Sequence, residues 1–155
     1  YPCYRLLEHG FTVDVAGPEV GSVTGKHGYA VETNLSLQAV KPEGYDLLVL
    51  PGGKGPETVR LYPGSLEAVR KMLDWGKVVA CICHGAQILV SANVIRGRKA
   101  TCWKGIRDDI IAAGADYLDE PVVVDGTLVT SRRPDDLPHF CREMFALLQV
   151  EAVAS

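Results

Sequence analysis

The sequence has no long apolar run and no cluster of positive charge. Apolar stretches such as residues 47–50 and 78–82 are far shorter than the ~20 residues that a membrane-spanning helix needs. The formal net charge is −3, and no group of Lys and Arg residues offers the footprint that binds nucleic-acid phosphates. No basic and apolar leader with a small-residue cleavage site is present either. We therefore expect a cytoplasmic protein that binds neither a membrane nor nucleic acid.

The cysteines lack the spacing of a disulfide framework or of a metal site. There are five of them, an odd number scattered along the chain, which indicates free thiols in a reducing compartment. Cys81 and Cys83 are separated by one residue, so on a strand they would point to opposite faces and could not hold one ion together. Residues 52–55 lack the spacing of a phosphate-binding or dinucleotide-binding loop. We expect neither a metal nor another cofactor.

What the chain does contain is an alternation of strand-like and helix-like segments. With 155 residues, of which 47% are hydrophobic, it is long enough for one core and one domain over residues 1–155. Strands that alternate with helices predict a mainly parallel sheet covered by helices. The expected strands are 11–16, 45–50, 77–82 and 99–102, the hairpins 24–33 and 122–130, and the helices 1–9, 65–75, 84–92, 106–113 and 134–150.

The most informative segment runs from Lys77 to Val90, K-V-V-A-C-I-C-H-G-A-Q-I-L-V. A buried strand changes into a helix without a linker, and Cys83 stands at the corner with the small residues Cys81 and Gly85 two positions away on either side. This is the nucleophile-elbow pattern with Cys in place of Ser. Such a turn presents the thiol at the carboxyl edge of the sheet, where open α/β sheets bind ligands.

The position of Cys83 predicts a nucleophile. Unpaired amides at the start of a helix favour an anion, and the thiolate is the reactive form of cysteine. The backbone amide of His84 is placed to hold a developing oxyanion, and the backbone of Gly52 and Gly53, after the neighbouring strand, supplies a second donor. The sequence leaves open whether the imidazole of His84 is catalytic or merely exposed, because the side chain of an adjacent residue cannot easily fold back to hydrogen-bond its neighbour. Glu57, taken by itself, is interpreted as a solvated acid.

Several short motifs occur in order along the chain. They are T-G-K-H-G-Y at 24–29, L-P-G-G at 50–53, P-E at 56–57, I-C-H-G-A-Q at 82–87, G-R-K-A-T at 97–101 and V-V-V-D-G-x-L-V-T-S-R at 122–132. Together they resemble the PfpI family of intracellular cysteine hydrolases, which belongs to the superfamily of DJ-1 proteins and class I glutamine amidotransferases. So many ordered matches are much more specific than the elbow alone.

The resemblance implies a flavodoxin-like three-layer α/β sandwich, like that of class I glutamine amidotransferases, with helices on both faces of a mainly parallel sheet. It also implies that Cys83 is the nucleophile, that His84 is its general base, and that Glu57 is the matching carboxylate, reaching in from a neighbouring subunit. The oxyanion donors would be the amides of Gly53 and His84. The family therefore implies a homo-oligomer, a dimer or a hexamer, that completes the site in trans.

Two features depart from the family pattern. The family begins with a strand and a loop whose acidic residue hydrogen-bonds the nucleophilic thiol, whereas this sequence starts within the expected first helix. We therefore expect the complete protein to carry about fifteen further N-terminal residues that include this strand. Gly52 and Trp103 would line the substrate pocket, but close relatives often carry Tyr at the position of Trp103, and an indole cannot act as a phenolic proton donor.

The leading hypothesis is an enzyme whose Cys83 thiolate attacks a carbonyl carbon. Its substrate would be a small peptide or amide, cleaved through a thioester, or a reactive aldehyde such as methylglyoxal, which is turned into a hydroxy acid. Members of the family are peptidases, glyoxalases and protein deglycases. We favour a glyoxalase or deglycase, because a site buried between subunits admits small substrates better than folded proteins.

Two other functions compete with this hypothesis. One is a redox-sensing or chaperone-like stress protein in which Cys83 is oxidised. The sequence leaves open whether Cys102 lies close enough to Cys83 to act as a resolving thiol. The other is a glutaminase module, which is disfavoured because it needs an H-x-E pair late in the chain, whereas His139 is followed by Phe140 and Cys141.

Overall fold

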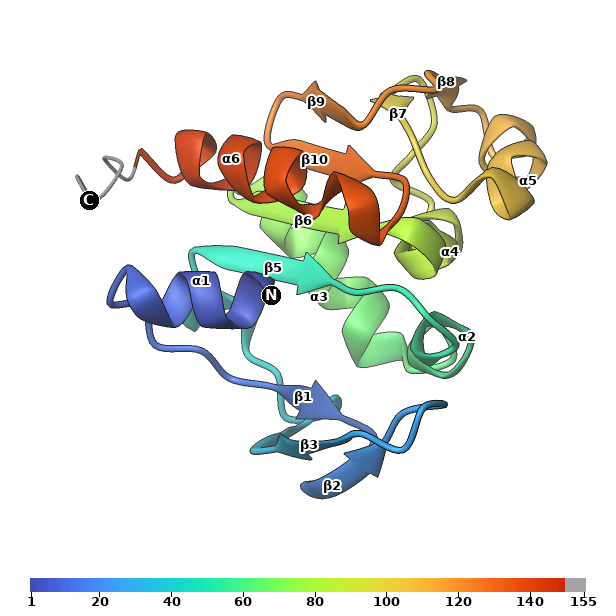
Figure 1. Ribbon diagram of the computed structural model, residues 1–155. Coiled ribbons are helices and arrows are strands. Elements are labelled where there is room, and N and C mark those ends of the chain that lie inside the picture. Colours follow the sequence, from blue (N-terminus) through green and yellow to red (C-terminus); the bar gives the residue numbers. More distant parts are fainter. Residues whose placement is uncertain (150–155) are drawn as a thin grey trace.

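A four-stranded sheet forms the centre of the computed structural model, which describes residues 1–149. Its strands are β5 (Leu47–Leu50), β6 (Val78–Ile82), β9 (Val122–Asp125) and β10 (Leu128–Ser131). They lie in the order β5, β6, β10, β9. The first three run parallel, and β9 runs antiparallel to β10, to which a tight turn joins it (Figure 1).

Helices cover both faces of this sheet. They are α1 (Pro2–Glu8) and α6 (Leu137–Leu147) on one face, and α3 (Pro63–Asp74) and α4 (Ala86–Ser91) on the other (Figure 1). Side chains alternate along a strand, so Ala80 of β6 packs with Phe140 on the first face, while Val79 packs with Met72 on the second. The expected three-layer α/β sandwich is therefore confirmed.

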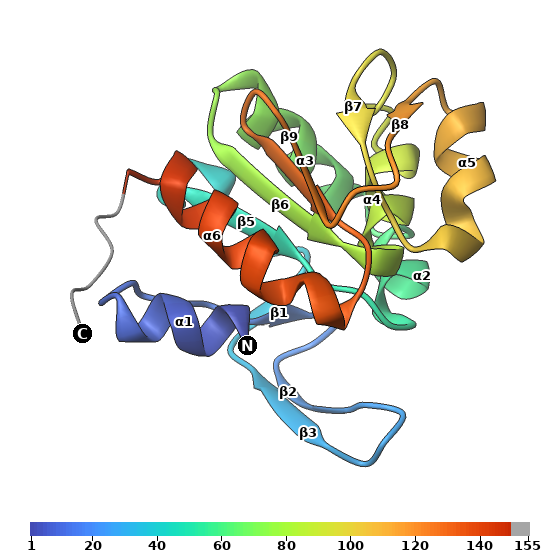
Figure 2. The same ribbon diagram turned by 45° about the horizontal axis from the view of Figure 1, so that its top comes forward.

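The remaining elements lie around the edges of the sheet. They are the short strands β1 (Ala16–Gly17), β4 (Leu35–Ser36), β7 (Lys99–Ala100) and β8 (Asp116–Tyr117), the hairpin strands β2 (Gly21–Thr24) and β3 (Ala30–Thr33), and the helices α2 (Gly55–Val59) and α5 (Arg107–Ala112). Single 3-10 turns are formed by Pro42–Gly44, Cys83–Gly85, Lys104–Ile106 and Pro134–Asp136. The β2–β3 hairpin projects from the body of the molecule (Figure 2). No helix within residues 1–149 is long and apolar enough to cross a membrane.

Most predicted elements are confirmed with bounds that differ by a few residues, but one expected strand is largely absent. The strand expected at 11–16 is reduced to Ala16–Gly17, because only these residues pair with another strand, β4. The strand β5 lies at the edge of the described sheet, and only Leu50 in it is fully buried. The helix expected at 134–150 begins with a 3-10 turn and its α-helical part ends at Leu147, while Val150 lies outside the described residues.

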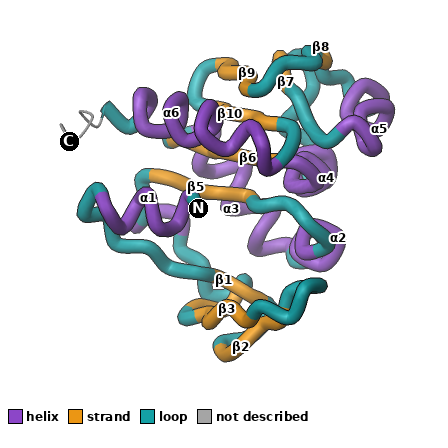
Figure 3. The backbone as a smooth tube through the Cα atoms, in the orientation of Figure 1, coloured by secondary structure: helices purple, strands orange, loops and turns teal. Residues whose placement is uncertain are grey.

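The three parallel strands direct their carboxyl ends to one edge of the sheet. Because the strands are in register, Gly52, Cys83 and Arg132 leave the sheet at this edge. Figure 3 shows the connecting segments after β5, β6 and β10 meeting there. The fold thus brings together motifs that are far apart in the sequence.

At the opposite end of the sheet, Lys77 ties the start of β6 to the turn before β5. Its Nζ donates hydrogen bonds to the carbonyl oxygens of Pro42 at 3.2 Å, Glu43 at 3.0 Å and Tyr45 at 2.6 Å. The ammonium group also lies 5.4 Å from the ring centre of Trp75. One side chain therefore satisfies three backbone acceptors and fixes the two strands relative to each other.

We predict that Lys77→Met lowers the free energy of unfolding by about 1 to 3 kcal/mol, because it leaves these partly buried carbonyl groups without their donor. Lys71→Met is the matched control. Lys71 forms an exposed ion pair with Glu67 at 2.9 Å, and its loss is expected to cost less than about 0.5 kcal/mol. Urea unfolding followed by circular dichroism measures both values. Equal losses in the two variants would contradict the role assigned to Lys77.

Candidate active site

Cys83 occupies a strained backbone conformation at the corner between β6 and the helix that follows. Its φ is 62°, in the left-handed region that side chains other than glycine rarely adopt. This conformation costs roughly 1–2 kcal/mol for a residue with a Cβ. The 3-10 turn Cys83–Gly85 starts directly after Ile82 and continues into α4. The predicted strand–turn–helix is therefore confirmed, and the turn presents the thiol at the carboxyl edge of the sheet.

Close backbone packing holds this corner. A Cβ atom added at Gly85 would lie 2.6 Å from the carbonyl oxygen of Leu50 and 3.0 Å from Sγ of Cys81. A Cβ atom added at Gly52 would lie 2.8 Å from Cβ of Cys83. Only glycine at these two positions lets the loop after β5 pack against the turn that carries Cys83.

The thiol of Cys83 contacts the imidazole of the next residue. Sγ of Cys83 lies 3.4 Å from Nδ1 of His84, which is a hydrogen-bond distance for sulfur. The expectation that an adjacent residue cannot fold back onto its neighbour's side chain is wrong here, because the left-handed backbone at Cys83 changes the direction of the chain between the two residues. His84 is therefore placed to take the proton of the thiol.

An apolar cavity lies on one side of the thiol. Its volume is about 260 Å³, and it is lined by Pro2, Val49, Pro51, Gly52, Gly53, Ile82, Cys83, Pro134 and Leu137. The sequence analysis placed Gly52 there but missed Pro134 and Leu137. The only sequence feature that marks these residues is a proline at the start of the last helix. A proline there indicates where a helix begins and gives no indication of a binding site.

Trp103 lies near the imidazole of His84, and it is not among the residues that line the cavity beside the thiol. Its ring centre is 6.4 Å from that of His84, and its backbone amide donates a 3.4 Å hydrogen bond to the carbonyl oxygen of Cys83. The ammonium group of Lys104 lies 5.9 Å from the indole ring centre. The site therefore has an aromatic side chain without a hydroxyl group at this edge.

Glu57 and Gly53 lie on the segment after β5. Glu57 is exposed in α2, and no hydrogen bond or ion pair within residues 1–149 joins it to His84. Gly53 has a φ of 76°, which directs the loop past the thiol-bearing turn. The structure thus brings Gly52, Gly53, Cys83 and His84 together within one chain, but within residues 1–149 no contact joins the Glu57 carboxylate to His84.

Two of the buried cysteines, Cys81 and Cys102, lie in a different apolar layer from Cys83, whereas Cys141 belongs to the same layer. Burial raises the pKa of the Cys102 thiol to about 12, and it raises the pKa of Cys81 well above its ordinary value. Both side chains belong to the apolar layer under α3 and α4, whereas Cys83 packs against the layer under α1 and α6. Sγ of Cys102 donates instead to the carbonyl oxygen of Trp103 at 3.3 Å. Cys102 is therefore a buried thiol with a raised pKa that is engaged with a backbone carbonyl in a different apolar layer from Cys83.

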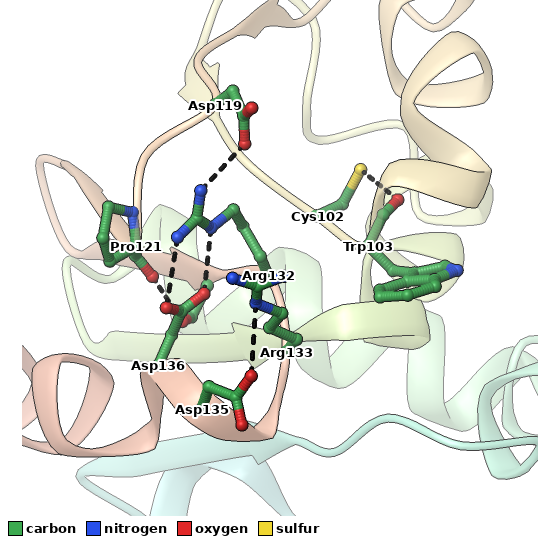
Figure 4. A network of polar contacts seen from close by, with 9 residues as sticks. Cys102, Trp103, Asp119, Pro121, Arg132, Arg133, Asp135 and Asp136 are labelled. Atoms are coloured by element: carbon green, nitrogen blue, oxygen red, sulfur yellow. Dashed lines mark hydrogen bonds and ion pairs between the residues drawn. The ribbon is translucent and has the colours of Figure 1, made fainter.

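An arginine network, which the sequence analysis missed, fixes the loop after β10 (Figure 4). Nε and Nη2 of Arg132 donate to the buried carboxylate of Asp136 at 2.9 and 3.2 Å, and Nη1 donates to Asp119 at 2.9 Å. Asp135 and Asp136 stand in the first turn at the start of the last helix, where acidic residues are common. The network instead holds the turn that carries Pro134, and hence one wall of the cavity beside Cys83.

We predict that Cys83→Gly is more stable than Cys83→Ala, by about 1 kcal/mol, because glycine adopts the left-handed conformation without strain. Cys81 in β6 is the matched control position, since its backbone is extended and glycine there is expected to be less stable than alanine by about 0.5–1 kcal/mol. Thermal and urea unfolding of the four variants measure both differences. The same ranking at both positions would argue against strain at Cys83.

Comparison with known proteins places this site in a family. The model of the DJ-1/PfpI family matches residues 1–147. Over 149 aligned residues the chain is 52% identical to Deglycase PfpI of Pyrococcus furiosus. The alignment covers 96% of this chain and 90% of that protein. Over 150 aligned residues it is 48% identical to protein/nucleic acid deglycase 2 of Escherichia coli. That alignment covers 95% of this chain and 87% of the other protein.

A solved structure has the same fold. It is a two-domain protein from Anabaena variabilis with a DJ-1/ThiJ/PfpI-like and a ferritin-like domain, and it superposes with a TM-score of 0.95 at 36% identity. The match covers 99% of this chain and 45% of that one. The family model and the relatives both extend over almost the whole chain, and the chain belongs to the DJ-1/PfpI family.

Proposed function

We propose that this protein is a cysteine-dependent deglycase or glyoxalase, whose Cys83 thiolate attacks the carbonyl carbon of a small reactive aldehyde or of the adduct that such an aldehyde forms with an amine. The observation that carries the proposal is the 3.4 Å contact between Sγ of Cys83 and Nδ1 of His84 on a strained turn. Relatives that are 48% and 52% identical are named deglycases, which supports the same chemistry here.

His84 acts as the base. Nδ1 of His84 takes the proton of the thiol, and the thiolate forms a bond to the carbonyl carbon while the carbonyl π electrons move to oxygen. The backbone amides of Gly53 and His84 hold the resulting oxyanion. Neither amide donates to a backbone carbonyl among the turn and loop hydrogen bonds of the described chain, which supports this role.

The same residues carry the intermediate to product. With methylglyoxal the first adduct is a hemithioacetal. His84 first returns the thiol proton to the oxyanion, which completes the hemithioacetal. It then moves the proton of the sulfur-bearing carbon to the neighbouring carbonyl carbon, while the hydroxyl proton passes to the neighbouring oxygen, and this gives a lactoyl thioester. Water attacks the thioester, and lactate and the free thiol are released. Trp103 has no hydroxyl group to donate, so in this chain the proton steps depend on His84.

A second copy of the chain completes the site in this proposal. Glu57 of the partner subunit accepts a hydrogen bond from the imidazole and stabilises its protonated form. The exposure of Glu57 on α2 and the absence of a contact with His84 within residues 1–149 favour this arrangement over one within a single chain. The protein would then be an obligate homo-oligomer.

We predict that Cys83→Ser lowers kcat/KM for lactate release from methylglyoxal, and for release of the amine from a methylglyoxal-treated amino acid, by at least about 10²-fold. Cys102→Ser is the matched control and is expected to keep activity within about 3-fold, because Cys102 lies on the other side of the sheet and Ser keeps its hydrogen bond. Assays with a fluorogenic peptide amide test the peptidase alternative. Undiminished aldehyde turnover by Cys83→Ser would refute the proposed nucleophile.

Complementation tests whether Glu57 acts in trans. We expect Glu57→Gln and Cys83→Ser each to be impaired, whereas subunits of the two variants, mixed after reversible dissociation, regain up to about one quarter of the wild-type activity in a two-fold assembly. The quarter arises because half of the assemblies are mixed and each mixed assembly has one complete site. Glu8→Gln, on the exposed face of α1, is the control and needs no rescue. Activity of the mixture that equals the mean of the separate variants would place Glu57 in its own subunit's site, or outside any site.

A further inference from the structure

A second cavity lies behind the nucleophile, between α2, α4 and α5. Its volume is about 190 Å³, and it shares no lining residue with the cavity beside Cys83. Val90 and Ile110 provide apolar wall, while Arg60, Gln87 and Asp109 bring polar groups to it. A volume of this size corresponds to about six water molecules, which suits a small organic molecule and excludes a peptide.

Two residues of opposite charge, Arg60 and Asp109, line this cavity. Nε of Arg60 donates to Oγ of Ser91 at 2.8 Å, and its two terminal nitrogens have no acceptor among residues 1–149. Asp109 is exposed and forms no ion pair within the same residues. The guanidinium and carboxylate groups are therefore more than 4.0 Å apart.

A neutral acceptor also lacks a partner there. Oε1 of Gln87 is buried and has no hydrogen bond within the described chain. A buried polar atom without a partner costs about 1–3 kcal/mol, so such an atom beside a cavity indicates a missing donor. Gln87 also lines the cavity, and because the terminal torsion of Gln is broad, a rotation of its amide group would be needed for this oxygen to meet a ligand there.

We propose that this cavity binds a small zwitterion, a free α-amino acid, with the carboxylate on Arg60 and the ammonium group on Asp109 and Gln87. A simple anion would gain Arg60 but meet the Asp109 carboxylate, and a simple cation would gain Asp109 but meet Arg60. A molecule that carries both charges satisfies both residues and supplies the donor that Gln87 lacks. One wall of the site is formed by α4, the helix that follows the turn of Cys83, yet the site is separate from the apolar cavity beside the thiol.

The test is a titration of the full chain with L-alanine, followed by isothermal calorimetry and ligand-observed NMR. We expect a dissociation constant below about 5 mM for L-alanine, and at least 10-fold weaker binding of propionate and of ethylamine, each of which carries only one of the two charges. Arg60→Met and Asp109→Asn are each expected to weaken L-alanine binding by at least about 10-fold.

Matched variants separate this site from general effects. Asp108→Asn changes the neighbouring acid of α5, which pairs with Arg107 at 2.9 Å outside the cavity, and Arg70→Met removes an arginine that donates to Ala92 on the far side of α4. Both should bind L-alanine like the unchanged protein. Protein whose Cys83 is blocked with iodoacetamide should also retain binding, and this readout stays independent of the proposed enzymatic activity.

Four results would overturn the proposal. They are absence of L-alanine binding up to about 20 mM, equal binding of propionate, loss of binding on Cys83 alkylation, and equal weakening by the two control variants. If the unchanged protein does not bind L-alanine and Arg60→Met alters the molecular mass in solution, a second copy of the chain fills the cavity instead.

Discussion

The left-handed turn at Cys83 is the constraint on which the site depends. A residue with a Cβ resists this conformation, so the surrounding structure must hold it. Full burial of β6 anchors the chain before the turn, and the close approach of Gly85 to the carbonyl oxygen of Leu50 anchors it afterwards. The strain has a chemical consequence, because the same backbone angle that exposes the thiol brings the imidazole of His84 to within 3.4 Å of it.

Parallel strands explain why the other parts of the site converge on this turn. The carboxyl ends of β5, β6 and β10 share one edge, and each contributes one segment around the thiol: Gly52 and Gly53, then Cys83 and His84, then the turn that begins at Pro134. The first segment is held by glycine packing and the last by the ion pairs of Arg132. Rigid elements therefore position a site that is built almost wholly from connecting segments.

The thiol of Cys83 and the imidazole of His84 have different surroundings. The thiol lies beside an apolar cavity, which suits a small carbonyl compound, whereas the imidazole lies toward Trp103 and the exposed α2. A carboxylate that stabilises the imidazole in the proposed mechanism would have to approach from that open side. Helix α4 lines the second cavity through Gln87 and Val90 but does not line the cavity beside Cys83, so the two places at which a small molecule is proposed to bind are separate.

The sequence by itself determined the elements whose signal is local. The apolar run and the small residues around Cys83 are contiguous, so the elbow, β6 and the β9–β10 hairpin could be predicted, and the ordered motifs indicated the family and the layered fold. Pairing and proximity depend on contacts between distant segments and were decided only by the tertiary structure. Residues 11–15 have strand-like alternation, but a strand needs a partner, and only Ala16–Gly17 pair with one. Likewise, the opposite sides taken by Cys83 and Cys102, and the meeting of Arg60 with Asp109 in one cavity, follow from how helices pack on the sheet.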